Sequence, residues 1–254
     1  MVTLLQPALN AGFVDTPVGT HISRTIMLAD LRRLLDACSA DADLAAYRVA
    51  VVQENVLLKP TVTTRKESFA RLRQLYALDR AVPLFAALRS LWQDDPLAQP
   101  MLAMLCALGR DPLLRSTADS LLNTPVGTAV TSELFESIVT NVFSGRYSQA
   151  SLASLGRNIA SSWQQSGHLH GKLHKVRAQA VARPGAVVYA LLLGYLNGGR
   201  GEGLFHTIWT RVLEAPLHVL DTQAQTAAQR GWIEYRRVGD VVEVEFRHLL
   251  QSFS

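Results

Sequence analysis

The residues best suited to chemistry in this sequence are cations without acidic neighbours. No Asp or Glu occurs between Glu136 and Glu202, although 21 acidic residues in a chain of 254 would place about five in an interval of this length. The same interval carries Arg146, Arg157, Lys172, Lys175, Arg177, Arg183 and Arg200, together with His168, His170 and His174. Such a local excess of positive charge indicates a surface that binds phosphate groups.

A helix predicted over residues 148–165 would present part of this charge. Ser148 is a suitable N-cap, and one face of the helix is apolar, with Leu152, Leu155, Ile159 and Trp163 at helical spacing. The opposite face combines small residues and hydrogen-bonding or cationic residues without a carboxylate: Gln149, Ala153, Arg157, Ser161 and Gln164. A face of this composition can enter a groove of DNA and reach phosphates or base edges.

The residues after this helix lose the helical period and partly alternate, which predicts a β-ribbon near residues 168–182. The ribbon would be a wing that lies along the nucleic-acid backbone with its basic side chains. The candidate binding residues of this second unit are therefore Arg146, Gln149, Arg157, Lys172, Lys175 and Arg177.

A similar order of features occurs earlier, in "NVLLKPTVTTRKESFARLRQLY" from Asn55. Like "NVFSGRYSQASLASLGRNIASSW" from Asn141, it consists of the end of an apolar helix, a short polar or basic turn and a new helix. That is the layout of a helix-turn-helix. Thr64 and Glu67 have capping-box spacing, which predicts that the new helix begins at Arg65. The apolar stripe Phe69, Leu72 and Tyr76 should face the core.

Basic side chains at the start of this helix oppose the helix dipole, whereas a bound phosphate would be favoured there. Taken alone, a solvated helix with excess charge is the simpler interpretation. The likeness to the acid-free second unit favours phosphate binding instead. The candidate residues of this first unit are Lys59, Arg65, Lys66 and Arg73.

Motifs of common catalytic and metal sites do not stand out in the sequence. "GGRGEG" lacks the ending of a P-loop, and no nucleophile elbow, zinc-protease motif or close carboxylate pair occurs. His168, His170 and His174 have a spacing that a metal could use, but no nearby Cys or carboxylate completes the site, so a basic wing is the simpler interpretation. Cys38 and Cys106 are typical of buried free thiols in a reducing compartment. We expect no catalytic residues, no metal and no cofactor.

Apolar periodicity predicts a mainly α, multi-helical fold with two helix-turn-helix or winged-helix-like units. The predicted helices span 21–37, 40–57, 64–78, 83–92, 97–108, 112–122, 131–143, 148–165, 184–196, 203–213 and 216–230, and a C-terminal β-hairpin spans 232–246. We expect an N-terminal helical domain, 1–124, and a C-terminal winged-helix-like domain, 125–254. The longest uncharged apolar run, 186–196, is shorter than the about 20 residues that span a bilayer, and the N-terminus lacks a signal-peptide pattern. These features predict a cytoplasmic protein without a membrane segment.

Four segments carry a resemblance to a known family: "ENVLLKPTVTTRKESFARLRQLY", "LASLGRNIASSWQQSGHL", "YALLLGYLNGGRGEGLF" and "AAQRGWIEYRRVGDVVEVEF". In pattern and order, along most of the chain, they resemble the BrxA family of BREX (bacteriophage exclusion) phage-defence systems. The resemblance implies a small, mainly helical, non-enzymatic protein that binds double-stranded DNA. It would serve, with other BREX proteins, a system that methylates host DNA and blocks phage replication. It supplies no residue-level binding motif.

The net charge of +4 is modest, so the function prediction depends on where the charges lie. We expect a double-stranded DNA-binding accessory protein that acts mainly through phosphate contacts and takes no small-molecule substrate. Two alternatives stay open. One is a scaffold protein that docks an acidic partner protein in a defence complex. The other is an RNA-binding protein, because a basic helical surface does not by itself distinguish the two nucleic acids.

Overall fold

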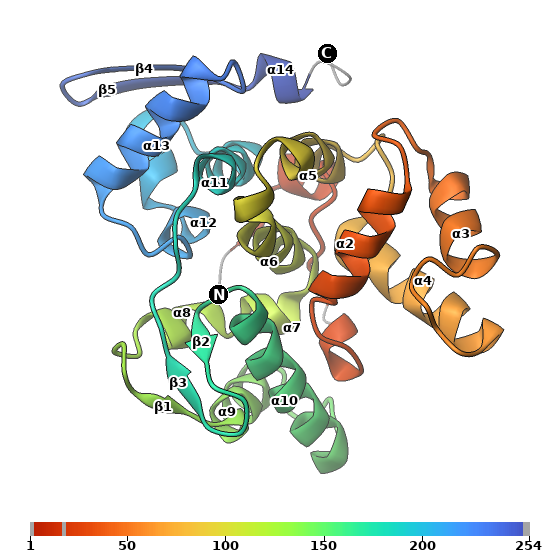
Figure 1. Ribbon diagram of the computed structural model, residues 1–254. Coiled ribbons are helices and arrows are strands. Elements are labelled where there is room, and N and C mark those ends of the chain that lie inside the picture. Colours follow the sequence, from red (N-terminus) through yellow and green to blue (C-terminus); the bar gives the residue numbers. More distant parts are fainter. Residues whose placement is uncertain (1–2, 17–18, 251–254) are drawn as a thin grey trace.

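The computed structural model describes residues 3–16 and 19–250, and it is mainly helical, as predicted (Figure 1). The first half contains α1 (Gln6–Asn10), α2 (Leu28–Ala37), α3 (Leu44–Val52), α4 (Val62–Tyr76), α5 (Pro83–Asp94), α6 (Gln99–Arg110), α7 (Pro112–Arg115) and α8 (Ala118–Leu122), with 3-10 helices at Thr20–Ile22 and Pro96–Ala98. The second half contains β1 (Ala129–Val130), α9 (Ser132–Val142), α10 (Gln149–Gln165), β2 (Leu169–His170), β3 (Lys175–Arg177), α11 (Pro184–Leu196), a 3-10 helix at Gly201–His206, α12 (Ile208–Arg211), α13 (Leu217–Gln229), β4 (Glu234–Val238), β5 (Val241–Glu245) and α14 (Arg247–Leu250).

Helix α11 lies at the centre of the molecule. Every residue from Pro184 to Gly194 is buried, as expected for a helix that is apolar all round. It packs against α5 and α6 on one side and against α12 and α13 on the other. No helix within residues 3–16 and 19–250 combines the length and the apolar character that crossing a bilayer requires.

One end of the molecule, in the lower part of Figure 1, is built from β1, α9, α10, β2 and β3. β3 is the central strand of a small antiparallel sheet in the order β1-β3-β2, with Ala129 opposite Val176 and Leu169 opposite Arg177. A helix pair followed by a hairpin is the layout of a winged helix. The predicted ribbon is thus confirmed between residues 169 and 177, and its third strand, β1, was not predicted.

The C-terminal hairpin lies at the opposite end, beside α13 (Figure 1). β4 and β5 pair with Val238 opposite Val241, so that the two-residue turn is Gly239–Asp240. Gly239 has a φ of +58°, the conformation that a tight hairpin turn needs and that glycine adopts at little cost. The hairpin predicted over 232–246 is confirmed.

Several helix boundaries differ from the predicted ones for local reasons. Thr61, not Thr64, is the N-cap of α4, because its side chain accepts the Thr64 amide at 3.1 Å. The predicted capping box, with a start at Arg65, was therefore wrong, and Glu67 instead approaches Arg24 at the surface, at 3.7 Å. The segments predicted as single helices over 112–122 and 203–213 are each broken into two short helices.

The first helix-turn-helix-like unit consists of α3 and α4, joined by residues 53–61. This connection is longer than the about three to four residues of a compact helix-turn-helix, and α4 leads into α5 rather than into a hairpin. The domain boundary at 124–125 stays a prediction. Residues from both sides of it share one hydrophobic core, in which α11 contacts α5 and α6.

Candidate nucleic-acid interface

A groove of about 480 Å³ lies between α10, the start of α9 and the wing, the name used here for residues 169–177. It brings together three of the predicted cations, Arg157 from α10 and Lys172 and Lys175 from the wing. Its other lining residues are Ala129, Val130, Thr131, Ser132, Glu133, Ala160, Ser161, Leu173 and His174. The groove thus combines a partly apolar floor with cations and hydroxyl groups.

Helix α10 begins where the sequence predicted. The Ser148 side chain accepts the Ser151 amide at 3.3 Å, and the apolar stripe Leu152, Leu155, Ile159 and Trp163 is buried. Gly156 lies at the closest approach to α9, where an added Cβ would be 2.6 Å from the Ser132 carbonyl oxygen. Because this face is held against α9, the opposite face is outward, and Gln149 and Arg157 are exposed.

Two of the three cations of the groove, Arg157 and Lys175, are positioned by contacts with α10. The Arg157 guanidinium donates to the Ser154 hydroxyl at 3.1 Å, one turn earlier on the same helix. The Lys175 ammonium donates to the Gln164 side chain, which holds β3 against α10, and partial burial lowers the pKa of this ammonium. Lys172 is exposed in the turn of the wing. Phosphate oxygens entering the groove would meet all three.

One carboxylate, Glu133, also lines the groove, although it was not among the predicted site residues. Hydrogen bonding from the Thr131 side chain, with a smaller contribution from the backbone, lowers the pKa of Glu133, so it is anionic at neutral pH. Glu133 lies in the first turn of α9, where the helix dipole favours a negative charge. In the sequence, Glu133 lies just before the acid-free interval that begins after Glu136, so nothing local marks it as part of this surface. In a DNA groove such a group can accept a hydrogen bond from a cytosine amino group.

Arg177, predicted as a wing contact, is instead an internal residue that is 1% exposed. Its guanidinium donates to the Leu121 carbonyl at 3.0 Å and to the His168 carbonyl at 3.2 Å, and it forms an ion pair with Glu214. Lys175 and Arg177 share one face of β3, but Lys175 reaches α10 near the rim, whereas Arg177 reaches the core. Arg177 cannot contact DNA from this position, and the prediction was wrong.

His168 is also internal rather than part of a basic wing surface. It is 0% exposed, its Nε2 lies 2.8 Å from the Val212 carbonyl oxygen, and its Nδ1 lies 2.8 Å from the Ser166 hydroxyl. Burial lowers its pKa to about 4, so the ring is neutral at neutral pH. Within the described residues, no group of three or more His, Cys, Asp or Glu side chains is arranged to hold a metal ion.

The cations of the first unit are divided between structural and surface positions. Lys59 is paired with Asp30 at 2.9 Å, and the Arg65 guanidinium lies 3.4 Å from the carbonyl oxygens of Val52 and Lys59. These two residues therefore help to hold the α3–α4 connection. Lys66 and Arg73 are exposed on α4, and Arg146 is exposed before α10.

A second hollow, of about 390 Å³, lies on the other flank of α10. Its lining includes Arg24, Asp30 and Lys59 together with Asn158 and Gln165 of α10. The structure thus brings one predicted residue of the first unit, Lys59, next to the helix of the second.

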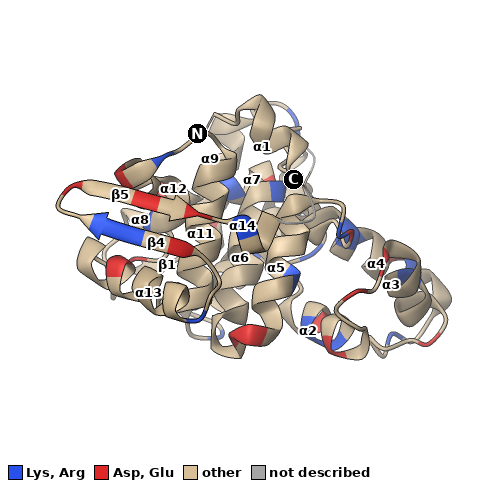
Figure 2. Cartoon of the chain, turned by 90° about the horizontal axis from the view of Figure 1, so that it is seen from above, with Lys and Arg blue, Asp and Glu red and all other residues tan. Residues whose placement is uncertain are grey.

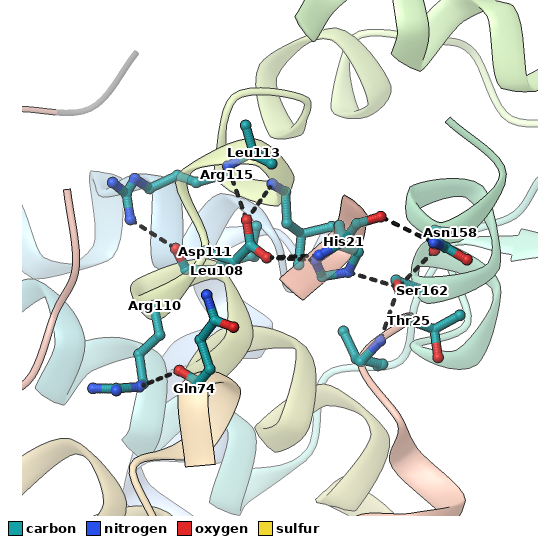
Figure 3. Close-up of polar contacts among 12 residues, drawn as sticks. His21, Thr25, Gln74, Leu108, Arg110, Asp111, Leu113, Arg115, Asn158 and Ser162 are labelled. Carbon is teal, nitrogen blue, oxygen red and sulfur yellow. Dashed lines mark hydrogen bonds and ion pairs between the residues drawn. The ribbon is translucent and has the colours of Figure 1, made fainter. Parts of the chain in front are cut away.

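A buried cluster of His21, Asp111 and Ser162 positions α10 (Figure 3). His21 Nδ1 lies 2.7 Å from Asp111 Oδ2, and His21 Nε2 lies 2.8 Å from Ser162 Oγ. These are the residue types of a nucleophilic triad, but all three are at most 1% exposed. The Ser162 hydroxyl also contacts the Asn158 carbonyl at 2.8 Å and the Ile26 amide at 3.0 Å, so it is fully occupied by the protein.

This buried cluster therefore has a structural role rather than a catalytic one. Burial opposes the charge on Asp111, yet the charge of His21 and hydrogen bonds from His21 and Leu114 outweigh it and lower the pKa of this carboxyl. Asp111 also caps α7 by accepting the Leu113 amide at 2.9 Å. Gly19 passes so close that an added Cβ would be 2.2 Å from this carboxylate. The cluster fixes α10 to the α6–α7 junction and to the segment before α2.

The C-terminal hairpin offers a different surface. Figure 2 shows basic residues in β4 beside acidic residues in β5, and the outer face of the hairpin has a hollow lined by Glu234, Arg236, Glu243, Glu245 and Arg247. On the inner face, Arg237 pairs with Asp221 at 2.9 Å and with Glu202 at 3.3 Å. A surface of mixed sign attracts a polyanion less than the groove beside α10 does.

In comparisons with known proteins, the chain matches no family model and no curated protein sequence.

Proposed function

We propose that this protein is a non-enzymatic double-stranded DNA-binding protein that uses α10 and the wing, mainly through phosphate contacts. One observation carries the proposal: Arg157, Lys172 and Lys175 converge on one groove beside the exposed face of α10. They come from separate elements that the fold brings together, and because these three cations outnumber the one carboxylate of the groove, Glu133, a bound anion would be attracted there. Duplex DNA supplies regularly spaced anions and a groove for the helix.

The geometry of a winged helix gives each element a role. An α-helix with its side chains is about 10–12 Å wide, and the major groove of B-DNA is about 12 Å wide. Helix α10 would enter the major groove of the DNA with Gln149 and Arg157, while Lys172 and Lys175 contact the DNA phosphate backbone beside it. Glu133 and the neutral side chains of the groove would add a modest sequence preference to a largely sequence-independent affinity.

We also propose a biological setting, an accessory role in a BREX-type phage-defence system in the cytoplasm with other BREX proteins. This part rests on the resemblance of the sequence segments to the BrxA family.

The exposed cations Lys66, Arg73 and Arg146 would extend the DNA contact beyond the groove beside α10.

The test is binding of a labelled random-sequence duplex, followed by fluorescence anisotropy. The variant has Arg157, Lys172 and Lys175 changed to Ala. A matched control has three exposed arginines outside the groove, Arg80, Arg230 and Arg236, changed to Ala, so that both variants lose the same charge. We expect the groove variant to lose affinity at least tenfold more than the control variant.

Equal losses in the two variants would show that net charge, not the groove, determines binding. No binding of the wild type at low salt would overturn the DNA proposal and favour the docking of an acidic partner protein. Competition by duplex RNA as strong as that by duplex DNA would favour an RNA-binding protein, because the A-form major groove does not admit a helix.

A further inference from the structure

The turn of the wing projects a single leucine into solvent. Leu173 is 89% exposed, more than any other large hydrophobic side chain in the part of the chain that the structure describes. It lies between the basic residues Lys172 and His174, which are both exposed. Transfer of this side chain from water to an apolar surface would be favourable, so Leu173 could add to the binding of a partner that offers such a surface.

The backbone of the turn holds Leu173 outward. Gly171 has a φ of +92°, and an added Cβ there would be 2.0 Å from the His174 carbonyl oxygen, so the turn can close this tightly only with glycine. The paired strands that flank it hold Leu169 opposite Arg177, and Arg177 is fixed in the core by its pair with Glu214. The strands that carry the Leu173 turn are therefore fixed to the protein core.

Leu173 also lines the rim of the groove that holds Arg157 and Lys175. A partner that reaches it must therefore offer negative charge beside an apolar surface. Stacked base pairs flanked by phosphates have this composition, and proteins insert Leu, Ile, Phe or Met side chains between base steps from the minor groove.

We propose that Leu173 is a wedge that the wing inserts into the minor groove, where it partly unstacks one base step and bends the duplex. The inference rests on the proposed DNA binding and adds a distinct action to it. With α10 in the major groove, the wing lies over the adjacent minor groove, and Lys172 and Lys175 hold the phosphates on either side of the inserted side chain. Flexible pyrimidine–purine steps are the ones that open at least cost.

The experiment measures unstacking and bending separately from affinity. A short duplex carries 2-aminopurine at a TA step, whose fluorescence rises when the base unstacks, and a donor and acceptor at its ends report bending by energy transfer. The variants are Leu173→Ala, Leu173→Lys and Leu173→Phe, with Leu97→Ala as the control, because Leu97 is a 70% exposed leucine on the α5–α6 connection.

The wild type, the Leu97→Ala control and Leu173→Phe should raise the 2-aminopurine signal and shorten the end-to-end distance. Leu173→Ala should abolish both changes while altering affinity less than about tenfold, because apolar burial and the cost of unstacking oppose each other. Leu173→Lys should bind at least as tightly as the wild type, through its added charge, and still fail to unstack the base.

Two outcomes would overturn the inference, and they are distinguishable. If the wild type binds the duplex but Leu173→Ala gives the same fluorescence and bending, the wedge is wrong and the DNA-binding proposal stands. If the wild type does not bind the duplex at low salt, the proposed function itself fails, and the wedge fails with it.

Discussion

Acidification should destabilise this protein through His168, which joins the end of α10 to α12. The ring is fully buried, with Nε2 positioned to donate to the Val212 carbonyl oxygen at 2.8 Å. Burial lowers its pKa from 6.5 to about 4; the charge of Arg177 acts in the same direction, whereas the Val212 carbonyl and Glu214 oppose it. The unfolded chain therefore takes up this proton near pH 6.5, and the folded protein takes it up only near pH 4.

The stability that the neutral ring contributes is complete above about pH 6.5 and is lost as the pH falls toward 4. At about 1.4 kcal/mol for each tenfold change in proton affinity, the full loss is roughly 3 kcal/mol. Between pH 7.5 and 5.5, before most carboxylates titrate, the same linkage gives about 1.3 kcal/mol.

The assay is urea unfolding followed by tryptophan fluorescence at these two pH values, for the wild type and His168→Gln. Glutamine does not titrate, and its amide can still donate to the Val212 carbonyl. The wild type should lose about 1.3 kcal/mol more than the variant, since every other group titrates alike in both. Equal losses would refute the inferred depression of the His168 pKa.

Two further predictions concern contacts that hold the interface in place. Glu214→Gln should cost about 3–5 kcal/mol of unfolding free energy, because it leaves Arg177 buried without its counter-ion. Asp119→Asn, which breaks the exposed pair with Arg211, should cost less than about 1 kcal/mol; similar costs in urea unfolding would contradict the structural role of Arg177. Gly156→Ala should destabilise by about 1 kcal/mol or more by pushing α10 from α9, and a melting temperature at or above that of the wild type would refute the close approach.

The helices were largely predictable from sequence because their signals are local. The Ser148 cap and the apolar stripe of α10 lie within one segment, and both are confirmed. Where two local signals competed, as with Thr61 and Thr64 before α4, the sequence could not decide which would cap the helix. Periodicity also continued across the breaks that divide residues 112–122 and 203–213.

The candidate site was only partly predictable, because its electrostatics depend on residues distant in sequence. Arg177 has the sequence pattern of a surface cation because its counter-ion, Glu214, lies 37 positions away. Ser162 lies 141 positions from His21, so nothing local to α10 revealed the cluster that fixes it. Arg157, Lys172 and Lys175 lie close together in the sequence, on a helix and on the hairpin that follows it, and these three residues line one groove. Their binding to phosphate stays a prediction.

The most direct test of phosphate binding by the groove is the salt dependence of duplex binding. The logarithm of the binding constant should fall linearly with the logarithm of salt concentration, with a slope of about −0.9 for each phosphate contact. If Arg157, Lys172 and Lys175 each contact a phosphate, changing all three to Ala should make the slope shallower by up to about 2.7. An unchanged slope in a variant that remains folded would contradict phosphate binding at this groove.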